Sequence, residues 1–158
     1  MKLNGRKLNK ADYEVCVIPR RDGDLVFKAK PILDFEPFNK LCPMPIPPSI
    51  TLPGGATSQD VEDTNYRAQA DTWAENRTDW IIIQSLSATE GLTWDGVNPS
   101  DPNTWKNFRS EFETSGLTNI EVNAVIAIVI EACGLNNKKI EEATKRFLAG
   151  QAAAHAKP

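Results

Sequence analysis

Apolar residues recur at helical spacing in three consecutive segments, 101–116, 118–134 and 136–150, and a glycine closes each one. This pattern predicts three helices in the C-terminal half of the chain. In the first, Asp101 is the expected N-cap, and Pro102 fills a first helical position that needs no N–H. Its apolar stripe consists of Trp105, Phe108 and Phe112.

The second segment carries opposing signals. Thr118 and Glu121 have the spacing of a capping box, which favours a helix start. Seven β-branched residues between Ile120 and Ile130 would also suit a buried strand. We predict a helix, because the caps at both ends frame more residues than a typical strand holds. Few polar residues interrupt it, so we expect it to be largely buried, inside the domain or against another chain.

The third segment has a conventional amphipathic pattern. Asn136 or Asn137 caps it, and Gly150 is expected to end it. The Ala-rich residues 151–158 are then expected to fray. The apolar stripe consists of Ile140, Ala143, Phe147 and Leu148.

The longest predicted helix lies upstream, from Ser58 or Asp60 to about Ala88. Trp73 and Trp80 lie a heptad apart on one face of it. We interpret them as core anchors, because a base-stacking platform would need basic residues beside them. A turn-rich loop should connect this helix to the three that follow.

The N-terminal part predicts a β-hairpin. Residues 15–18 and 25–29 alternate as short strands, and residues 19–24 supply a turn that contains Asp-Gly. A lone hairpin is marginal in water, so it must pack on the helices or pair with another strand. Residues 1–10 are polar and basic, and we expect them to be loosely held.

Residues 31–56 differ in character from the rest, because they contain seven prolines interleaved with apolar side chains. This density predicts an extended backbone, neither helix nor central strand. Such a segment can lie across the helical body as a strap, or it can be exposed to recognise a partner. We favour the strap, because so much exposed apolar surface is unusual on a monomer. If the segment binds a partner, the candidate contacts are Phe35, Phe38, Met44 and Ile46.

Length and composition place these elements in one folded unit. At 158 residues, with 41% apolar and 25% charged residues, the chain is typical of a single globular domain. We expect a mainly α fold of about four helices with a β-hairpin and a Pro-rich strap (1–56), a helical part (57–150) and a frayed tail (151–158). It is α+β if the hairpin is counted. The longest apolar run is seven residues and no secretory signal is evident, so we expect a cytoplasmic protein without membrane contact.

Charge is distributed unevenly along the chain. Residues 1–40 carry a net charge of +3, residues 41–135 carry −9, and residues 136–158 carry +3. The acidic middle argues against nucleic-acid binding, which needs clustered Lys and Arg. It suits a basic partner, or it serves solubility alone.

Motifs for catalysis, metals and cofactors are missing from the sequence. The three cysteines form no CxxC pair, and the single histidine, His155, lies in the tail, so no zinc site is expected. Gly54-Gly55 is not followed by the Lys of a P-loop, and no Gly-x-Ser-x-Gly elbow occurs. We therefore predict a protein that is not an enzyme, has no catalytic, metal or cofactor-binding residues, and needs no cofactor.

The order of features resembles the tail assembly chaperones of long-tailed bacteriophages, small proteins encoded just before the tape measure protein. The resemblance spans roughly residues 15–150. It rests on Gly23 to Ala29, Asp34-Phe35, Leu41-Cys42-Pro43, Trp80, Ser85-Leu86, Leu92 to Asp95, Asp101 to Trp105, Ser115-Gly116-Leu117, Glu121, Glu142-Ala143 and Phe147 to Gly150.

This resemblance implies a mainly helical, non-enzymatic protein of the host cytoplasm. It would bind the aggregation-prone tape measure protein and help to recruit tail tube protein, often in several copies as a homo-oligomer. The alternative is a structural virion protein, such as a head–tail adaptor or a tail completion protein, which also uses small helical subunits with extended arms.

Overall fold

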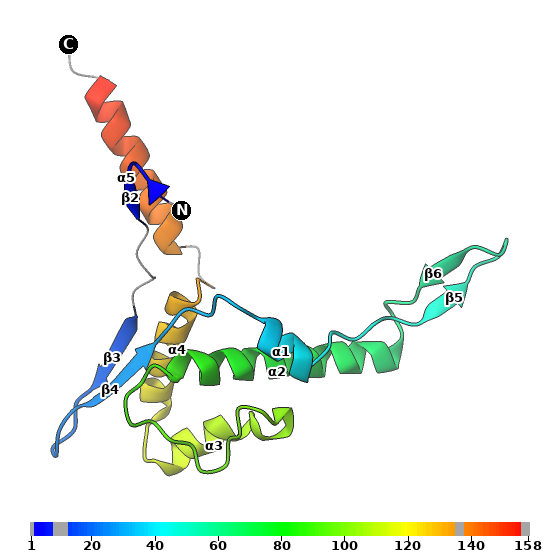
Figure 1. Ribbon diagram of the computed structural model, residues 1–158, viewed down its shortest axis with the longest axis horizontal. Coiled ribbons are helices and arrows are strands. Elements are labelled where there is room, and N and C mark those ends of the chain that lie inside the picture. Colours follow the sequence, from blue (N-terminus) through cyan, green and yellow to red (C-terminus); the bar gives the residue numbers. More distant parts are fainter. Residues whose placement is uncertain (1, 8–12, 135–137, 156–158) are drawn as a thin grey trace.

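The structure is a computed structural model, and it describes residues 2–7, 13–134 and 138–155. The fold is mainly helical, with about 48% of the chain in helices and a small antiparallel hairpin near the N-terminus, which confirms the predicted class (Figure 1). The helices within the described residues are α1 (Glu36–Leu41), α2 (Thr64–Leu86), α3 (Asn107–Thr114), α4 (Asn119–Ala132) and α5 (Lys138–His155).

The described strands form three separate antiparallel pairs: β1 (Lys2–Leu3) with β2 (Arg6–Lys7), β3 (Glu14–Ile18) with β4 (Leu25–Ala29), and β5 (Ser49–Thr51) with β6 (Thr57–Gln59). The β3–β4 pair is the predicted hairpin, and its register sets Val17 opposite Val26. The other two pairs were not predicted. Asn4 and Gly5, both with positive φ, form the first turn, and Gly54 and Gly55 do the same between β5 and β6.

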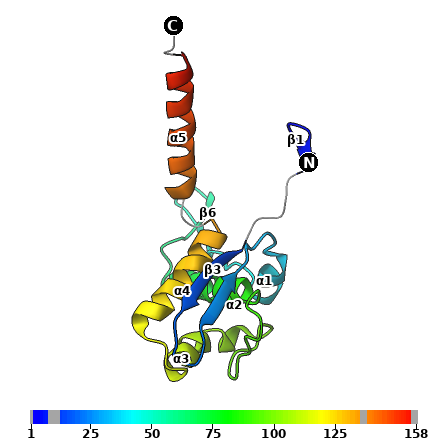
Figure 2. The ribbon, with the colours of Figure 1, turned by 90° about the vertical axis from the view of Figure 1, so that its left-hand side faces the viewer.

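The core surrounds the C-terminal half of α2. Residues 79–86 of that helix are all buried except Gln84, which is half-buried. The β3–β4 hairpin and α4 lie on one side of this half-helix, and α1 and α3 lie on others (Figures 1 and 2). Trp80 is buried and Trp73 packs partly against the core, so both are the core anchors predicted from sequence.

Helix α1 lies inside the proline-rich segment, where we expected no helix, and that prediction is wrong for residues 36–41. Pro37 occupies one of the first two helical positions, where no intrahelical hydrogen bond is lost. The helix places the side chain of Phe38 among three tryptophans. Its ring centroid is 5.7 Å from that of Trp73, 5.6 Å from that of Trp80 and 6.1 Å from that of Trp105.

Helix α4 confirms the choice of helix over strand. Both hydrogen bonds of the capping box between Thr118 and Glu121 are present. The expected burial holds on one face only: Val125 and Val129 are buried, and the opposite face is open. Upstream, the predicted first helix begins as a 3₁₀ turn, Pro102–Thr104, capped by Asp101, before α3 starts. Its stripe of three aromatic residues is buried as predicted.

Two predicted helix ends are wrong. Helix α2 begins at Thr64 with Asp63 as N-cap, because Ser58 is part of β6. Helix α5 continues through Gly150 to His155, so Gly150 does not end it and residues 151–155 are helical. A glycine lowers helix stability by only about 1 kcal/mol, and the alanines that follow favour the helix. The predicted caps Asn136 and Asn137, like residues 156–158, lie outside the described residues.

Candidate partner-binding surface

The clearest surface for a partner is an arm, which we define as residues 43–59. It leaves the body after α1, contains β5 and β6, and returns at the start of α2. In Figure 1 its first residues run alongside the N-terminal half of α2, and its β5–β6 hairpin extends beyond the end of that helix, away from the other described elements. At its base, the indole N–H of Trp73 donates to the carbonyl of Cys42 at 3.0 Å, and the N–H of Asp60 donates to the carbonyl of Pro48 at 2.8 Å.

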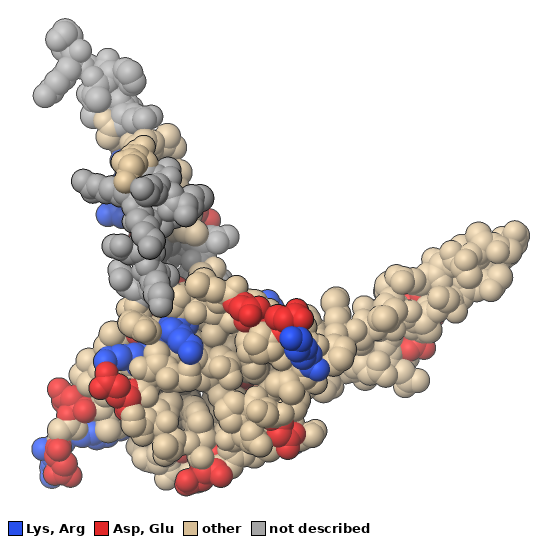
Figure 3. All heavy atoms as spheres, viewed as in Figure 1, with Lys and Arg blue, Asp and Glu red and all other residues tan. Residues whose placement is uncertain are grey.

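The arm carries no ionisable side chain, because the sequence has none between Cys42 and Asp60. Figure 3 shows it as a projection without charge beyond its base, although red and blue groups dot the body. Four apolar side chains are exposed on it: Met44 (65%), Ile46 (79%), Ile50 (40%) and Leu52 (42%). Apolar side chains on an uncharged projection meet a partner without desolvating a charge.

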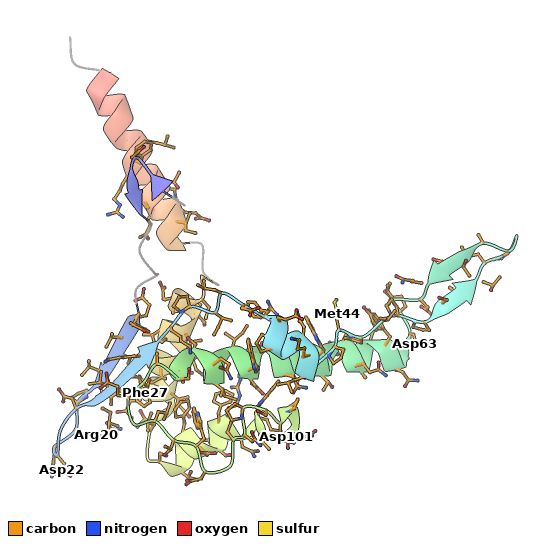
Figure 4. The ribbon with its side chains drawn as sticks, in the orientation of Figure 1. Arg20, Asp22, Phe27, Met44, Asp63 and Asp101 are labelled. Carbon is orange, nitrogen blue, oxygen red and sulfur yellow. The ribbon has the colours of Figure 1, made fainter. Side chains whose placement is uncertain are left out.

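Local restraints keep the arm extended. Its prolines restrict the backbone, and the N–H of Leu52 donates to the carbonyl of Ala56 at 2.7 Å to close the hairpin tip. It is mounted on a helix half that is itself unburied, since no residue from 64 to 78 is buried. The carboxylate of Asp63 starts this half by accepting a hydrogen bond from the N–H of Tyr66 at 2.8 Å. Figure 4 shows Asp63 at this junction, with Met44 where the arm leaves α1.

The four residues proposed from sequence separate into two pairs. Phe38 is fully buried. Phe35 is half-buried, with its ring centroid 5.8 Å from that of Trp80 and the guanidinium of Arg77 over its ring. These two residues hold the segment to the body. Met44 and Ile46 are on the arm and remain available for contact.

Sequence reasoning did not select Ile50 and Leu52, which extend the same surface toward the tip. The signal that could have found them is the absence of charge from residue 41 to residue 59, combined with alternating apolar residues.

Ionic contacts are concentrated on the body. Arg20, in the turn between β3 and β4, pairs with Glu121 at the start of α4 through both guanidinium nitrogens. This hydrogen bonding, together with bonds from Thr118, lowers the pKa of Glu121 to about 2. Burial raises the pKa of Asp79, and Arg109 at 3.9 Å opposes the shift. The first contact therefore links the β3–β4 turn to α4, and the second links α2 to α3.

A hollow of about 560 Å³ lies beside β4 and the loop 89–92. The hydroxyl of Thr89 closes the outer edge of β4 there, accepting from the N–H of Lys28 at 2.8 Å and donating to its carbonyl at 3.0 Å. Of the three charged residues that line the hollow, Lys28 and Glu90 pair with each other at 2.8 Å, and the third is Asp24.

Residues 2–7, 13–134 and 138–155 contain no group of three or more His, Cys, Asp or Glu side chains able to hold a metal ion. None of the helices in those ranges has the length and apolar character to cross a membrane. Comparison with known proteins finds no family model, curated protein or solved structure that matches this chain.

Proposed function

We propose that this chain is a tail assembly chaperone of a long-tailed bacteriophage, which binds the tape measure protein in the host cytoplasm. The observation that carries the proposal is the arm: an uncharged projection with four exposed apolar side chains, held clear of the body. The resemblance in the order of sequence features supports the same function.

The arm suits a long helical client. A client of this kind exposes apolar stripes before it assembles, and a chaperone must cover them without burying its own apolar surface first. The arm meets that need because prolines keep its apolar residues from collapsing onto the body. Met44 adds a flexible thioether that adapts to different client side chains. The net negative charge of residues 41–135 keeps the chaperone soluble before it binds its client.

Co-expression with the tape measure protein of the same phage tests the proposal. The tape measure protein should be insoluble alone and should co-elute with this chain from a size-exclusion column. Replacing Met44 and Ile46 together by Ser should abolish co-elution. The matched control replaces Leu33 and Val17, exposed apolar residues of the body (86% and 53%), by Ser, and should leave the complex intact. A tape measure protein whose solubility is unchanged by this chain would refute the proposal.

The same arm also suits a head–tail adaptor or tail completion protein, in which it would insert between neighbouring subunits. Purified mature virions separate the two functions. A chaperone is absent from them, and an adaptor is present in a fixed copy number, as mass spectrometry of the particles would measure.

A further inference from the structure

Two helices of the described chain leave an apolar face uncovered. On α4, residues three and four apart along one side are exposed: Ile120, Ala124, Ala127 and Ile130. On α5, the predicted stripe of Ile140, Ala143, Phe147 and Leu148 is exposed throughout. Most of the stability of a helix in a protein comes from packing its apolar face, and the 18-residue helix α5 leaves that face unpacked.

The two faces match in shape. Small residues occupy the middle of the α4 face, with a larger Ile at each end, whereas the α5 face presents a bulky Phe147. When the two helices are aligned antiparallel with Ile140 beside Ile130, Phe147 is level with Asn123, and the small side chains of Ala124 and Ala127 lie next to it along the α4 face. Large side chains over small ones are the arrangement that close helix packing requires.

The two helices also differ in charge. Helix α4 carries two glutamates and no Lys or Arg, and Glu121 already pairs with Arg20, whereas α5 carries four Lys or Arg and two Glu. The wider segments agree, since residues 41–135 have a net charge of −9 and residues 136–158 have +3. An antiparallel pairing also sets opposite ends of the two helix dipoles side by side.

Within one copy, α5 lies beyond the C-terminal end of α4 and points away from the body (Figures 1 and 2). The α5 stripe therefore does not cover the α4 face of its own chain. We propose that α5 of one copy packs antiparallel on the exposed face of α4 in a second copy, and that the second copy reciprocates. The result is a twofold dimer with two identical helix contacts, whatever the client of the arm. The arm, at the opposite end of α2, stays free.

Size-exclusion chromatography with light scattering, over a concentration series, tests this dimer. The wild-type chain should have twice the monomer mass of 17.5 kDa. Phe147→Glu and Ala127→Glu should each reduce the mass to that of the monomer. Neither side chain is in the core, so circular dichroism should show that the body stays folded. The matched controls, Ala149→Glu on the opposite side of α5 and Ala68→Glu on the exposed half of α2, should remain dimeric.

Mixing the two disrupting variants identifies the contact itself. Each variant alone has both contacts damaged. In a mixed pair, the intact α5 of the Ala127→Glu chain meets the intact α4 of the Phe147→Glu chain, so one of the two contacts is restored and a weaker dimer should return. A monomeric wild-type chain would overturn the proposal, as would a dimer that ignores either substitution. Variants that stay monomeric when mixed would overturn it too, because the intact α5 of one chain would then have failed to pair with the intact α4 of the other.

Discussion

Residues 31–42 and the arm that follows them both interleave prolines with apolar side chains, but they occupy different environments in the fold. Residues 31–42 are anchored to the body, with Phe38 fully buried among three tryptophans. Residues 43–59 form the arm and bury no side chain completely. The first half contains two phenylalanines and the second contains none. A phenylalanine offers enough buried area to offset the ordering of the chain around it, and scattered aliphatic residues between prolines do not.

Residues 31–42 therefore have a structural role, and residues 43–59 are the candidate for partner binding. The strap and the recognition segment, which sequence reasoning treated as alternatives, are consecutive parts of the same stretch. The aromatic half holds the arm in place, and the aliphatic half is left for a partner. Substitutions in the two halves should therefore affect different measurements.

The largest effect on stability is expected from Phe38→Ala. Removing a fully buried aromatic ring from the cluster should lower the free energy of unfolding by about 3–5 kcal/mol. Urea unfolding measures the change. Met44→Ala, six residues further on, is the matched control and should change stability by less than about 0.5 kcal/mol. Equal losses in the two variants would mean that the arm also packs on the body.

A smaller effect is expected at Ser85, which anchors the start of the segment. Its buried hydroxyl donates to the carbonyl of Lys30 at 2.7 Å, and the N–H of Lys30 donates to the carbonyl of Ser85 at 3.0 Å. Ser85→Ala removes one of these bonds inside the core and should reduce stability by about 1–3 kcal/mol. Ser87→Ala, at the exposed position just after the end of α2, should change the free energy of unfolding little in the same urea measurement. If the urea midpoints of Ser85→Ala and the wild-type chain were the same, the Ser85–Lys30 contact would not contribute to stability.

Acid should weaken the body and leave the arm unaffected, because the arm contains no ionisable side chain. The folded-state pKa of Glu121 is about 2, below its ordinary value of 4.5, so the ionised form stabilises the fold. That contribution is fully present above about pH 4.5 and is lost as the pH falls toward 2. The stability difference between wild type and Glu121→Gln should shrink over this window in urea titrations. Glu113→Gln, an exposed control in α3, should show no such trend.

The smallest effect on stability, and the largest on binding, is expected from the Met44 and Ile46 double Ser variant. Both side chains are exposed, so thermal unfolding should match wild type within about 0.5 kcal/mol. Capture of the tape measure protein should nevertheless be lost. A variant that unfolds early would show that these residues support the body after all.

Local signals allowed much of the helical part to be predicted. The capping box fixed the start of α4, and the spacing of Trp105, Phe108 and Phe112 identified a buried stripe. Helix α1 was missed because proline was read as excluding helix, although it is compatible with the first turn. The β5–β6 pair was missed because three-residue strands leave almost no periodicity to detect.

The candidate site was harder to predict than the fold. Phe35, Phe38, Met44 and Ile46 look equivalent in sequence, since each is an apolar residue between prolines. What distinguishes them is the position of Trp73, Trp80 and Trp105, residues 35 or more positions away from Phe38, which fold around the first pair only. Contacts over that separation are a property of the tertiary structure.

The proposed function depends most on contact of the client with the arm, and not with the body. Amide hydrogen exchange with and without the tape measure protein tests it directly, because β5 and β6 and the buried half of α2 report separately. We predict that exchange in residues 49–59 slows on binding and that exchange in residues 79–86 does not change. A complex that forms while exchange in the arm stays as fast as before would contradict the claim.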